Sequence, residues 1–281
     1  MLYSMKEILE VASKNNYAVA APNVFNELDA RAYIEAAEEC KAPVILDVLY
    51  NAHPDINFFG HMLRYMAEHA SVPVAINLDH GGIKSEHIKA IQSGFTSVMV
   101  DRSALPFDQN VKEVKEIVDI AHEVGVSVEA ELGHVGQAQN YEHDGGDKLT
   151  SPSEAKQFIE ATGVDALAVA IGTAHGAYPR GFTPYLDFDR LTEIKKTLNN
   201  FPLVLHGSSG TKLEDLRKAC QLGINKVNIS NDLCKASVYA LKEADLDGQK
   251  AYDVWTVAKD STKQKLKEMI DIYGSMNKAW W

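Results

Sequence analysis

Three histidines follow three separate apolar stretches of this sequence. His80 comes directly after Asn77-Leu78-Asp79, His175 after Ile171-Gly172-Thr173-Ala174, and His206 after Leu203-Val204-Leu205. Three imidazoles that leave a fourth position open are the ligand set of a catalytic zinc site. Asp79 would place a carboxylate that can transfer a proton beside such an ion. If the three stretches are neighbouring strands of one sheet, the sequence predicts a catalytic zinc centre.

Strand-like and helical patterns alternate eight times along the chain. The strand-like runs lie at 17–22, 43–48, 74–78, 97–100, 127–131, 166–171, 203–206 and 226–229. The helical patterns lie near 28–40, 57–69, 84–93, 109–124, 153–162, 188–198, 212–222 and 231–243. Most of the strand-like runs are apolar at odd and even positions alike, as is typical of parallel strands that helices cover on both faces.

Eight alternating units over 281 residues predict an α/β fold of the (β/α)8 or TIM barrel type. Segment 250–273 predicts an extra C-terminal helix. Since no linker or low-complexity stretch interrupts the pattern, we expect residues 1–281 to form a single barrel domain. A doubly wound open sheet is the alternative, and it is disfavoured because no Gly-x-Gly-x-x-Gly motif opens a helix.

Polar side chains are concentrated at the carboxyl ends of the predicted strands. They are Asn23, Asp79, His80, Asp101, Glu129, Glu131, His175, His206 and Asn228. Barrel enzymes carry their chemistry at this face. Asp101 and Glu131, on adjacent strands, suggest an auxiliary metal position or hydrogen-bond partners for the histidines; the competing interpretation is helix capping or pairing with lysine. Glu129 shares the strand face of Glu131, so it could point into the same mouth.

The other histidines are interpreted as ordinary residues of helices and loops, mostly facing solvent. They are His53, His61, His69, His87, His122, His134 and His143.

Two glycine- and serine-containing loops suggest an anion site. Segments 206–210 and 228–232 follow the last two predicted strands, where barrels often bind phosphate, and Gly172–Gly176 could supply a third loop. A turn followed by a helix N-cap is the simpler interpretation of each. Segment 133–152 has about twenty residues with little apolar periodicity, which is typical of a lid over a barrel mouth.

Bulk properties exclude several classes of partner. The net charge is -11, from 28 basic and 39 acidic residues, so neither nucleic acid nor an anionic membrane surface is an expected partner. No apolar run approaches the roughly 20 residues of a membrane span, and the start shows no signal-peptide core. Cys40, Cys220 and Cys234 are expected to be reduced thiols in a cytoplasmic protein. A cysteine nucleophile is disfavoured because none ends a strand.

Five motifs, in order along the chain, resemble the class II, zinc-dependent ketose-bisphosphate aldolases. They are Leu78–His80, Ser97–Asp101, Val128–Gly133, Ala168–Gly176 and Leu203–Gly210. The likeness runs from about Tyr17 to about Ala240 and is nearest to the fructose- and tagatose-bisphosphate branch. It implies reversible cleavage of a ketose phosphate into dihydroxyacetone phosphate and an aldehyde, by a homodimer or homotetramer.

The resemblance also assigns metal ligands. It implies a Zn²⁺ held by His80, His175 and His206, with Asp101 and Glu131 as carboxylates of a second, resting metal position. A monovalent cation, Na⁺ or K⁺, is implied near the phosphate. The chemistry agrees, because a Lewis acid at the ketose C2 and C3 oxygens stabilises the ene-diolate that cleavage creates.

Further roles follow from the same resemblance. Asp79 would be the acid/base on the C4 hydroxyl, Asn228 would contact the ene-diolate, and Asn23 would lie near the mouth. The phosphate of dihydroxyacetone phosphate would bind at Gly176, Gly207, Ser209 and Asn231.

The sequence departs from the family at positions that bear on the substrate. Leu49 aligns where the family has a Ser or Thr for the distal phosphate, and Val257 where it has an Arg; Asn231 replaces a Thr that binds the near phosphate. We therefore expect the dihydroxyacetone-phosphate half of the site to persist with an altered distal pocket. A ketose monophosphate, or a longer sugar phosphate with an unphosphorylated aldehyde half, is the predicted substrate.

Two smaller departures concern the lid and the first zinc histidine. The lid has Gly136-Gln137-Ala138-Gln139-Asn140 where the family has an acidic proton shuttle. Glu142 is the nearest replacement, with Tyr141 and His143 as weaker candidates. Gly81 occupies the variable position after the first zinc histidine.

Three rival functions stay open from the residues alone. A zinc-dependent barrel hydrolase usually has a His-x-His pair after an early strand, which this chain lacks, and hydrolysis leaves the glycine–serine loops unexplained. A Schiff-base aldolase needs a lysine at a strand end, whereas Lys226 is predicted to begin a strand. A zinc-binding, sugar-phosphate-sensing barrel without catalysis is the third, favoured by the altered lid and disfavoured by the presence of Asp79.

Overall fold

Eight parallel strands close into a barrel in the computed structural model, which describes residues 1–136, 149–176, 178 and 183–280. They are β1 (Val19–Pro22), β2 (Val44–Leu49), β3 (Val74–Gly81), β4 (Ser97–Val100), β5 (Ser127–Leu132), β6 (Ala166–Val169), β7 (Leu203–Leu205) and β8 (Ile224–Ile229). Strands pair in chain order, and β8 pairs with β1 to complete the ring. The predicted barrel is confirmed and the open sheet is excluded.

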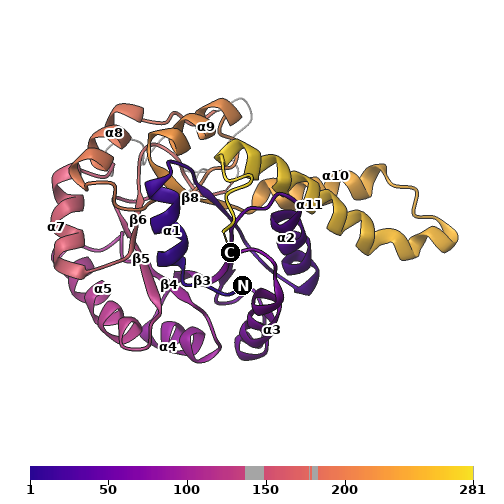
Figure 1. Ribbon diagram of the computed structural model, residues 1–281, viewed down its shortest axis with the longest axis horizontal. Helices are drawn as coiled ribbons and strands as arrows, with labels where there is room; N and C mark the ends of the chain where they lie inside the picture. The colour runs from indigo at the N-terminus through magenta and orange to yellow at the C-terminus, as the bar shows by residue number, and fades with distance from the viewer. Residues whose placement is uncertain (137–148, 177, 179–182, 281) are drawn as a thin grey trace.

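Helices connect successive strands and surround the barrel (Figure 1). They are α2 (Glu27–Glu39), α3 (Ile56–His69), α4 (Lys84–Gln92), α5 (Phe107–His122), α7 (Pro152–Thr162), α8 (Phe188–Thr197) and α9 (Leu213–Leu222). Several begin at side-chain caps: the carboxylate of Asp55 accepts from the Phe58 amide, and that of Asp187 accepts from the Arg190 amide. The predicted helices lie within two residues of these bounds.

Strand β8 begins earlier than the sequence pattern indicated. It starts at Ile224, so Lys226 is an interior strand residue that pairs with Val19 of β1, and the prediction that Lys226 begins the strand is wrong. Strand β3 ends later than expected: it continues beyond Leu78 through Asp79 and His80 to Gly81. The polar residues Asp79 and His80 are therefore held by strand geometry and not by a loop.

Helix α1 (Met5–Lys14) was not predicted, although its sequence carries a signal for its start. The Ser4 hydroxyl accepts from the Glu7 amide while the Glu7 carboxylate accepts from the Ser4 amide, which is a capping box. Met5, Ile8 and Leu9 are fully buried against the barrel interior. Because the Lys6 amide meets the hydroxyl of Ser127, the first residue of β5, α1 covers the amino-terminal end of the barrel.

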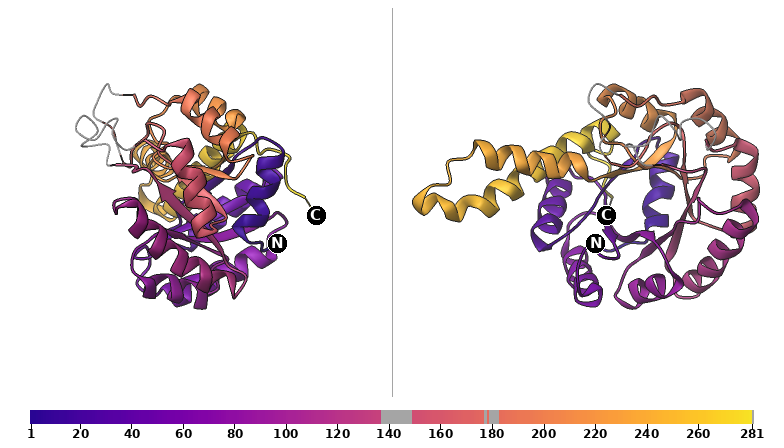
Figure 2. Two further views of the ribbon diagram at one scale, coloured as in Figure 1. Left: turned by 90° about the vertical axis from the view of Figure 1, so that its left-hand side faces the viewer. Right: turned by 180° about the vertical axis from the view of Figure 1, so that it is seen from behind.

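The C-terminal part forms a helical hairpin that extends away from the barrel (Figures 1 and 2). It consists of α10 (Asn231–Glu243), the 3₁₀ turn η2 (Gly248–Asp253) and α11 (Val254–Tyr273), so the expected extra helix is present. The far end of α11 returns to the barrel, where Tyr273 and Ile270 are fully buried. Among the described residues, none of the helices has the length and apolar character that crossing a membrane requires.

Candidate metal and substrate site

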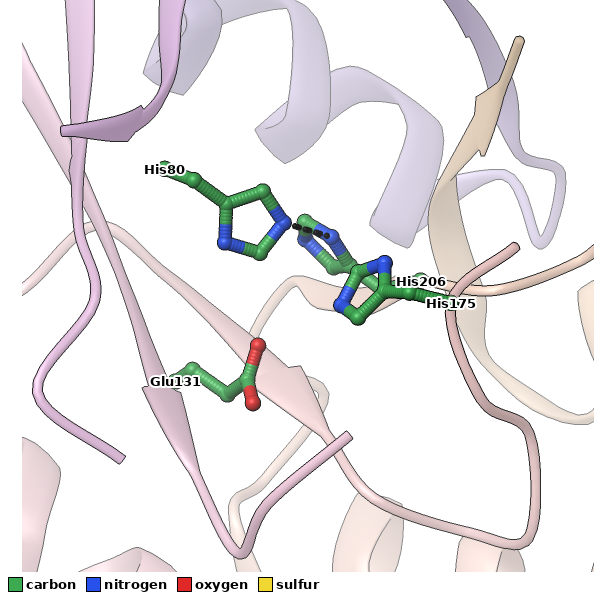
Figure 3. Close-up of side chains that lie close together, drawn as sticks. All are labelled: His80, Glu131, His175 and His206. Atoms are coloured by element: carbon green, nitrogen blue, oxygen red, sulfur yellow. Dashed lines mark hydrogen bonds between the residues drawn. The ribbon is translucent and has the colours of Figure 1, made fainter. Parts of the chain in front are cut away.

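His80, His175 and His206 converge at the carboxyl end of the barrel (Figure 3). His80 belongs to β3, His175 follows β6, and His206 comes directly after β7. Four ligand atoms lie within 4.8 Å of one another: one ring nitrogen from each of these histidines and a carboxylate oxygen of Glu131 on β5. His80 Nε2 lies 3.1 Å from His206 Nδ1. The structure thus brings together the three predicted ligands and one of the two predicted auxiliary carboxylates.

The backbone around His80 is unusual. His80 has a φ of 49°, in the left-handed region that non-glycine residues seldom occupy, and the pairing of β3 with β4 shifts register between Leu78 and Gly81. Such conformations cost of order 1–3 kcal/mol and are often found at functional sites. A Cβ on Gly81 would lie 2.4 Å from His87 Nε2, so glycine is required by close packing here.

Each of two histidines is anchored through the nitrogen that faces away from the cluster. Asp101 Oδ2 lies 2.9 Å from His80 Nδ1, and Glu129 Oε1 lies 2.8 Å from His206 Nε2. Carboxylate partners of this kind fix the tautomer and orientation of a metal-ligating imidazole. Asp101 was expected to be an auxiliary metal ligand, a partner of a histidine, a helix cap or a partner of a lysine. The structure places it as a hydrogen-bond partner of His80. Glu129 lies beneath His206, fully buried, and not among the residues that line the mouth.

The cluster suits a divalent cation by its chemistry. Glu131 Oε2 is buried without a hydrogen-bond partner, and burial together with the nearby Asp101 raises the pKa of Glu131 to about 8. Burial lowers the pKa of His80, but the carboxylates of Asp79, Asp101 and Glu131 outweigh it and raise that pKa to about 10. Excess negative charge therefore draws a proton to this point, and a cation held by imidazole nitrogens would replace that proton.

His175 differs from His80 in its electrostatic environment. Burial and the neighbouring rings of His206 and His80 lower the pKa of His175 to about 3. The His175 ring centroid lies 4.8 Å from that of His80 and 5.6 Å from that of His206. His175 is consequently neutral at physiological pH, which is the protonation state that binds a metal ion.

Asp79 lies beside the cluster and is held by two amides. Its Oδ2 accepts from Asn23 Nδ2 at 2.8 Å and its Oδ1 from Asn228 Nδ2 at 3.1 Å, while His80 Nε2 is 3.9 Å from Oδ1. Burial would raise the pKa of Asp79, but the charges of His80, His206 and Lys226 lower it to about 2. The carboxylate is therefore ionised and held in one orientation.

A cavity of about 360 Å³ opens above these residues. All six residues predicted to bind substrate line it: Asn23, Gly176, Gly207, Ser209, Asn228 and Asn231. Gly207 has a φ of 66°, and a Cβ there would lie 2.4 Å from the Ala174 carbonyl oxygen, so two of the predicted loops touch through this glycine. Asn231 is the first residue of α10, which directs the positive end of that helix toward the cavity.

Leu49 and Cys234 complete one side of the cavity wall. Leu49, the last residue of β2, is 38% exposed, and Cys234 on α10 is exposed as well. Among the residues that the structure describes, no lysine or arginine lines this cavity. Val257 is half-buried in α11 and is not part of the described lining. Glu142, Tyr141 and His143 lie outside the described residues.

Two buried charged residues of the barrel interior were missed as parts of the site. Lys226 on β8 and Asp47 on β2 are fully buried, and Lys226 Nζ lies 3.2 Å from Asp47 Oδ2 and 2.7 Å from Glu129 Oε2. For Asp47 the available signal was a single charged residue inside an otherwise apolar strand run, whereas the run around Lys226 also contains Asn225 and Asn228. Since Lys226 is enclosed by carboxylates below the cavity and does not line it, a Schiff-base lysine is disfavoured.

None of the remaining described histidines belongs to the cluster, and one of them departs from expectation. His87 is fully buried, with its ring nitrogens 3.0 Å from the Ile83 carbonyl oxygen and 3.2 Å from that of Met99. His122 meets Asp165 at 2.8 Å, and His134 meets the Ser103 hydroxyl at 3.0 Å. His87 is therefore a packing residue and an exception to the mostly solvent-facing positions expected for these histidines.

Comparison with known proteins gives a consistent relationship over the whole chain. The family model for class II fructose-bisphosphate aldolase matches residues 3–278. A fructose-bisphosphate aldolase of Thermus caldophilus is 40% identical, over 99% of this chain and 100% of that protein. YdjI of Escherichia coli K12, an uncharacterized protein, is 39% identical over 95% of this chain and 96% of its own. The crystal structure of the YdjI aldolase superposes with a TM-score of 0.89 at 36% identity and covers 100% of both chains.

Proposed function

This chain belongs to the class II fructose-bisphosphate aldolase family, a family of lyases, and we propose that it reversibly cleaves a ketose phosphate into dihydroxyacetone phosphate and an aldehyde. The observation that carries the proposal is the convergence of three imidazoles beside an ionised Asp79, in a cavity at the carboxyl end of the barrel. Barrel enzymes carry out their chemistry at this end.

The three imidazoles of His80, His175 and His206 are proposed to hold a Zn²⁺ ion, with Glu131 as a further ligand or resting position. When bound, the ion would supply the positive charge that stabilises the oxyanion developing at C2 as the C3–C4 bond breaks. Asp101 would keep His80 oriented, because their 2.9 Å contact fixes the ring nitrogen that faces away from the cluster.

Asp79 is proposed as the base that takes the proton from the C4 hydroxyl and returns it in the condensation direction. Its two amide contacts leave little freedom to rotate, so the carboxylate faces the cavity in one orientation. Asn228 lines the same cavity and is proposed to contact the ene-diolate. Glu142 is our candidate for the proton at C3; it lies outside the described residues.

The phosphate of dihydroxyacetone phosphate is proposed to bind at the loops that contain Gly176, Gly207 and Ser209 and at the start of α10. Backbone amides of glycine-containing loops and of a helix N-terminus form an anion site without a cationic side chain. The side-chain amide nitrogen of Asn231 is buried without a hydrogen-bond partner in the described structure, which supports a role as a donor to bound substrate.

The aldehyde half of the substrate is proposed to lack a phosphate. A second phosphate would need a cationic or hydroxyl-bearing partner, yet Leu49 and Cys234 occupy one wall and the described lining has no lysine or arginine. A ketose 1-phosphate, or a longer sugar phosphate whose distal end is uncharged, fits this wall better than a 1,6-bisphosphate. Desolvating an unpaired phosphate against Leu49 would be costly.

A substrate panel tests both the aldolase activity and the preference for a substrate with a single phosphate. Zinc-loaded enzyme is assayed on fructose and tagatose 1-phosphates beside the matching 1,6-bisphosphates, and we expect the 1-phosphates to have the higher kcat/KM. Leu49→Ser should shift the ratio toward the bisphosphates. A hundredfold preference of the wild type for a bisphosphate, about 2.7 kcal/mol, would reject the monophosphate assignment. No cleavage of any ketose phosphate, with no proton exchange of dihydroxyacetone phosphate, would reject the aldolase itself.

We also propose self-association, as a homodimer or homotetramer, through the α10–α11 hairpin. Its outer surface exposes large apolar side chains, including Tyr252 at 81% and Trp255 at 68%, which a single copy leaves in water. Size-exclusion chromatography with light scattering should give a mass that is a multiple of the 30.9 kDa chain mass. The substitution Trp255→Glu should lower that measured mass. A monomeric wild type at micromolar concentration would contradict this expectation.

A further inference from the structure

A chain of buried charged groups runs beneath the histidine cluster. Asp47 on β2, Lys226 on β8 and Glu129 on β5 are each 0% exposed. Lys226 Nζ joins the two carboxylates, at 3.2 Å from Asp47 Oδ2 and 2.7 Å from Glu129 Oε2. The second oxygen of Glu129 is 2.8 Å from His206 Nε2. A continuous path of polar contacts therefore leads from the barrel interior to one ring of the cluster.

Stability alone is a poor reason for this arrangement. Most barrel interiors are filled by bulky apolar side chains, and here the layer below consists of residues such as Ile45, Ala75 and Val204. Burying Lys226 and Glu129 as ions costs several kcal/mol per ion in desolvation, and apolar replacements of buried ion pairs are often neutral or stabilising. Burial also raises the pKa of Asp47 well above its ordinary value, so this carboxyl adds little favourable charge. The group is better explained by what it does to His206.

The contacts of His206 specify one tautomer. Glu129 is ionised by its contact with Lys226, so it can only accept, and His206 Nε2 must carry the hydrogen. On the other side of the ring, Asn228 Nδ2 lies 3.4 Å from His206 Nδ1, and an amide nitrogen can only donate. Nδ1 is therefore the nitrogen that carries a lone pair instead of a hydrogen, and it lies 3.1 Å from His80 Nε2 within the cluster (Figure 3).

We propose that Glu129 is a positioning residue which holds His206 with Nδ1 toward the metal, and that Lys226, braced by Asp47, acts by fixing Glu129. This inference rests on the metal site of the proposed function and deepens it. Asn77 extends the support, because its side-chain amide donates to Asp47 Oδ1 at 2.8 Å. The barrel interior thus sets the affinity of the site for its ion through one hydrogen bond.

Zinc affinity, measured by competition with a chromogenic chelator, tests the role of Glu129. Glu129→Gln keeps the side-chain shape but removes the charge that holds Nε2–H, and we expect affinity to fall about 10–100-fold. The matched control is Lys195→Met, which removes another buried lysine, one whose Nζ contacts Ser13 and Asn225 at the opposite end of the barrel. The control should bind zinc as the wild type does. Affinity of Glu129→Gln within threefold of wild type would overturn the proposal.

Lys226 is tested in the background of the first variant. If Lys226 acts on the metal only through Glu129, adding Lys226→Met to Glu129→Gln should change zinc affinity by less than threefold. A further loss of tenfold or more would show that Lys226 acts independently, and its assignment would be wrong.

A measurement on the wild type covers the case in which these variants do not fold. Nitrogen-15 spectra of the zinc-loaded protein labelled in histidine should show His206 protonated at Nε2 and metal-bound at Nδ1, and the reverse assignment would overturn the inference. Wild-type protein that binds no zinc would instead reject the metal site of the proposed function, so the two failures are distinguishable.

Discussion

Asp79→Asn is expected to lower kcat for cleavage by about 10²–10⁴-fold while zinc stays bound, the range that a positioned acid or base contributes. The substitution keeps the size of the side chain and removes its ability to accept a proton. Asp79 is not among the clustered ligand atoms, so metal affinity should change little. The measurement is single-turnover cleavage of the best substrate from the panel, with zinc content determined on the same samples.

A surface carboxylate gives the control for this variant. Asp119 on α5 pairs with Lys115 at the protein surface, and Asp119→Asn should leave kcat unchanged. If Asp79→Asn turns over at the wild-type rate, Asp79 is not the base, and the proton must go to another group in the cavity.

His206→Ala should lower kcat/KM by about 10³-fold or more, because Lewis-acid stabilisation amounts to several kcal/mol and each 1.36 kcal/mol is a factor of ten. The loss has two causes. One ligand disappears, and Glu129 is left fully buried without the ring that it holds. Zinc binding, measured by chelator competition, should fall together with activity.

His69→Ala is the matched control, since His69 is an exposed histidine whose ring contacts Tyr65 on the same helix. It should keep both zinc and activity. A His206→Ala enzyme that cleaves substrate normally without bound metal would remove the metal from the account.

The barrel was predictable because its signal is repeated. Eight apolar runs separated by amphipathic stretches favour an eight-stranded parallel barrel. The carboxyl ends of its strands share one face, so His80, His175 and His206 could be expected to meet there. Helix α1 could have been predicted as well, because Ser4 and Glu7 have the spacing of a capping box and Met5, Ile8 and Leu9 follow at helical intervals.

The partners of the histidines could not be assigned from the sequence. Asp101 and Glu131 end adjacent strands and look equivalent there, yet one holds His80 and the other joins the cluster. The different roles of the two carboxylates depend on side-chain rotamers and on the register shift between β3 and β4, neither of which has a sequence signature. Asp47 and Lys226 meet across the barrel from non-neighbouring strands, and such pairs have no fixed sequence spacing.

X-ray absorption at the zinc edge of active enzyme tests the central claim most directly. We predict about one zinc per chain, with three imidazole nitrogens at about 2.0–2.1 Å and no sulfur neighbour. Fully active protein without bound zinc or another divalent ion, or an ion whose ligands include cysteine sulfur, would contradict the account.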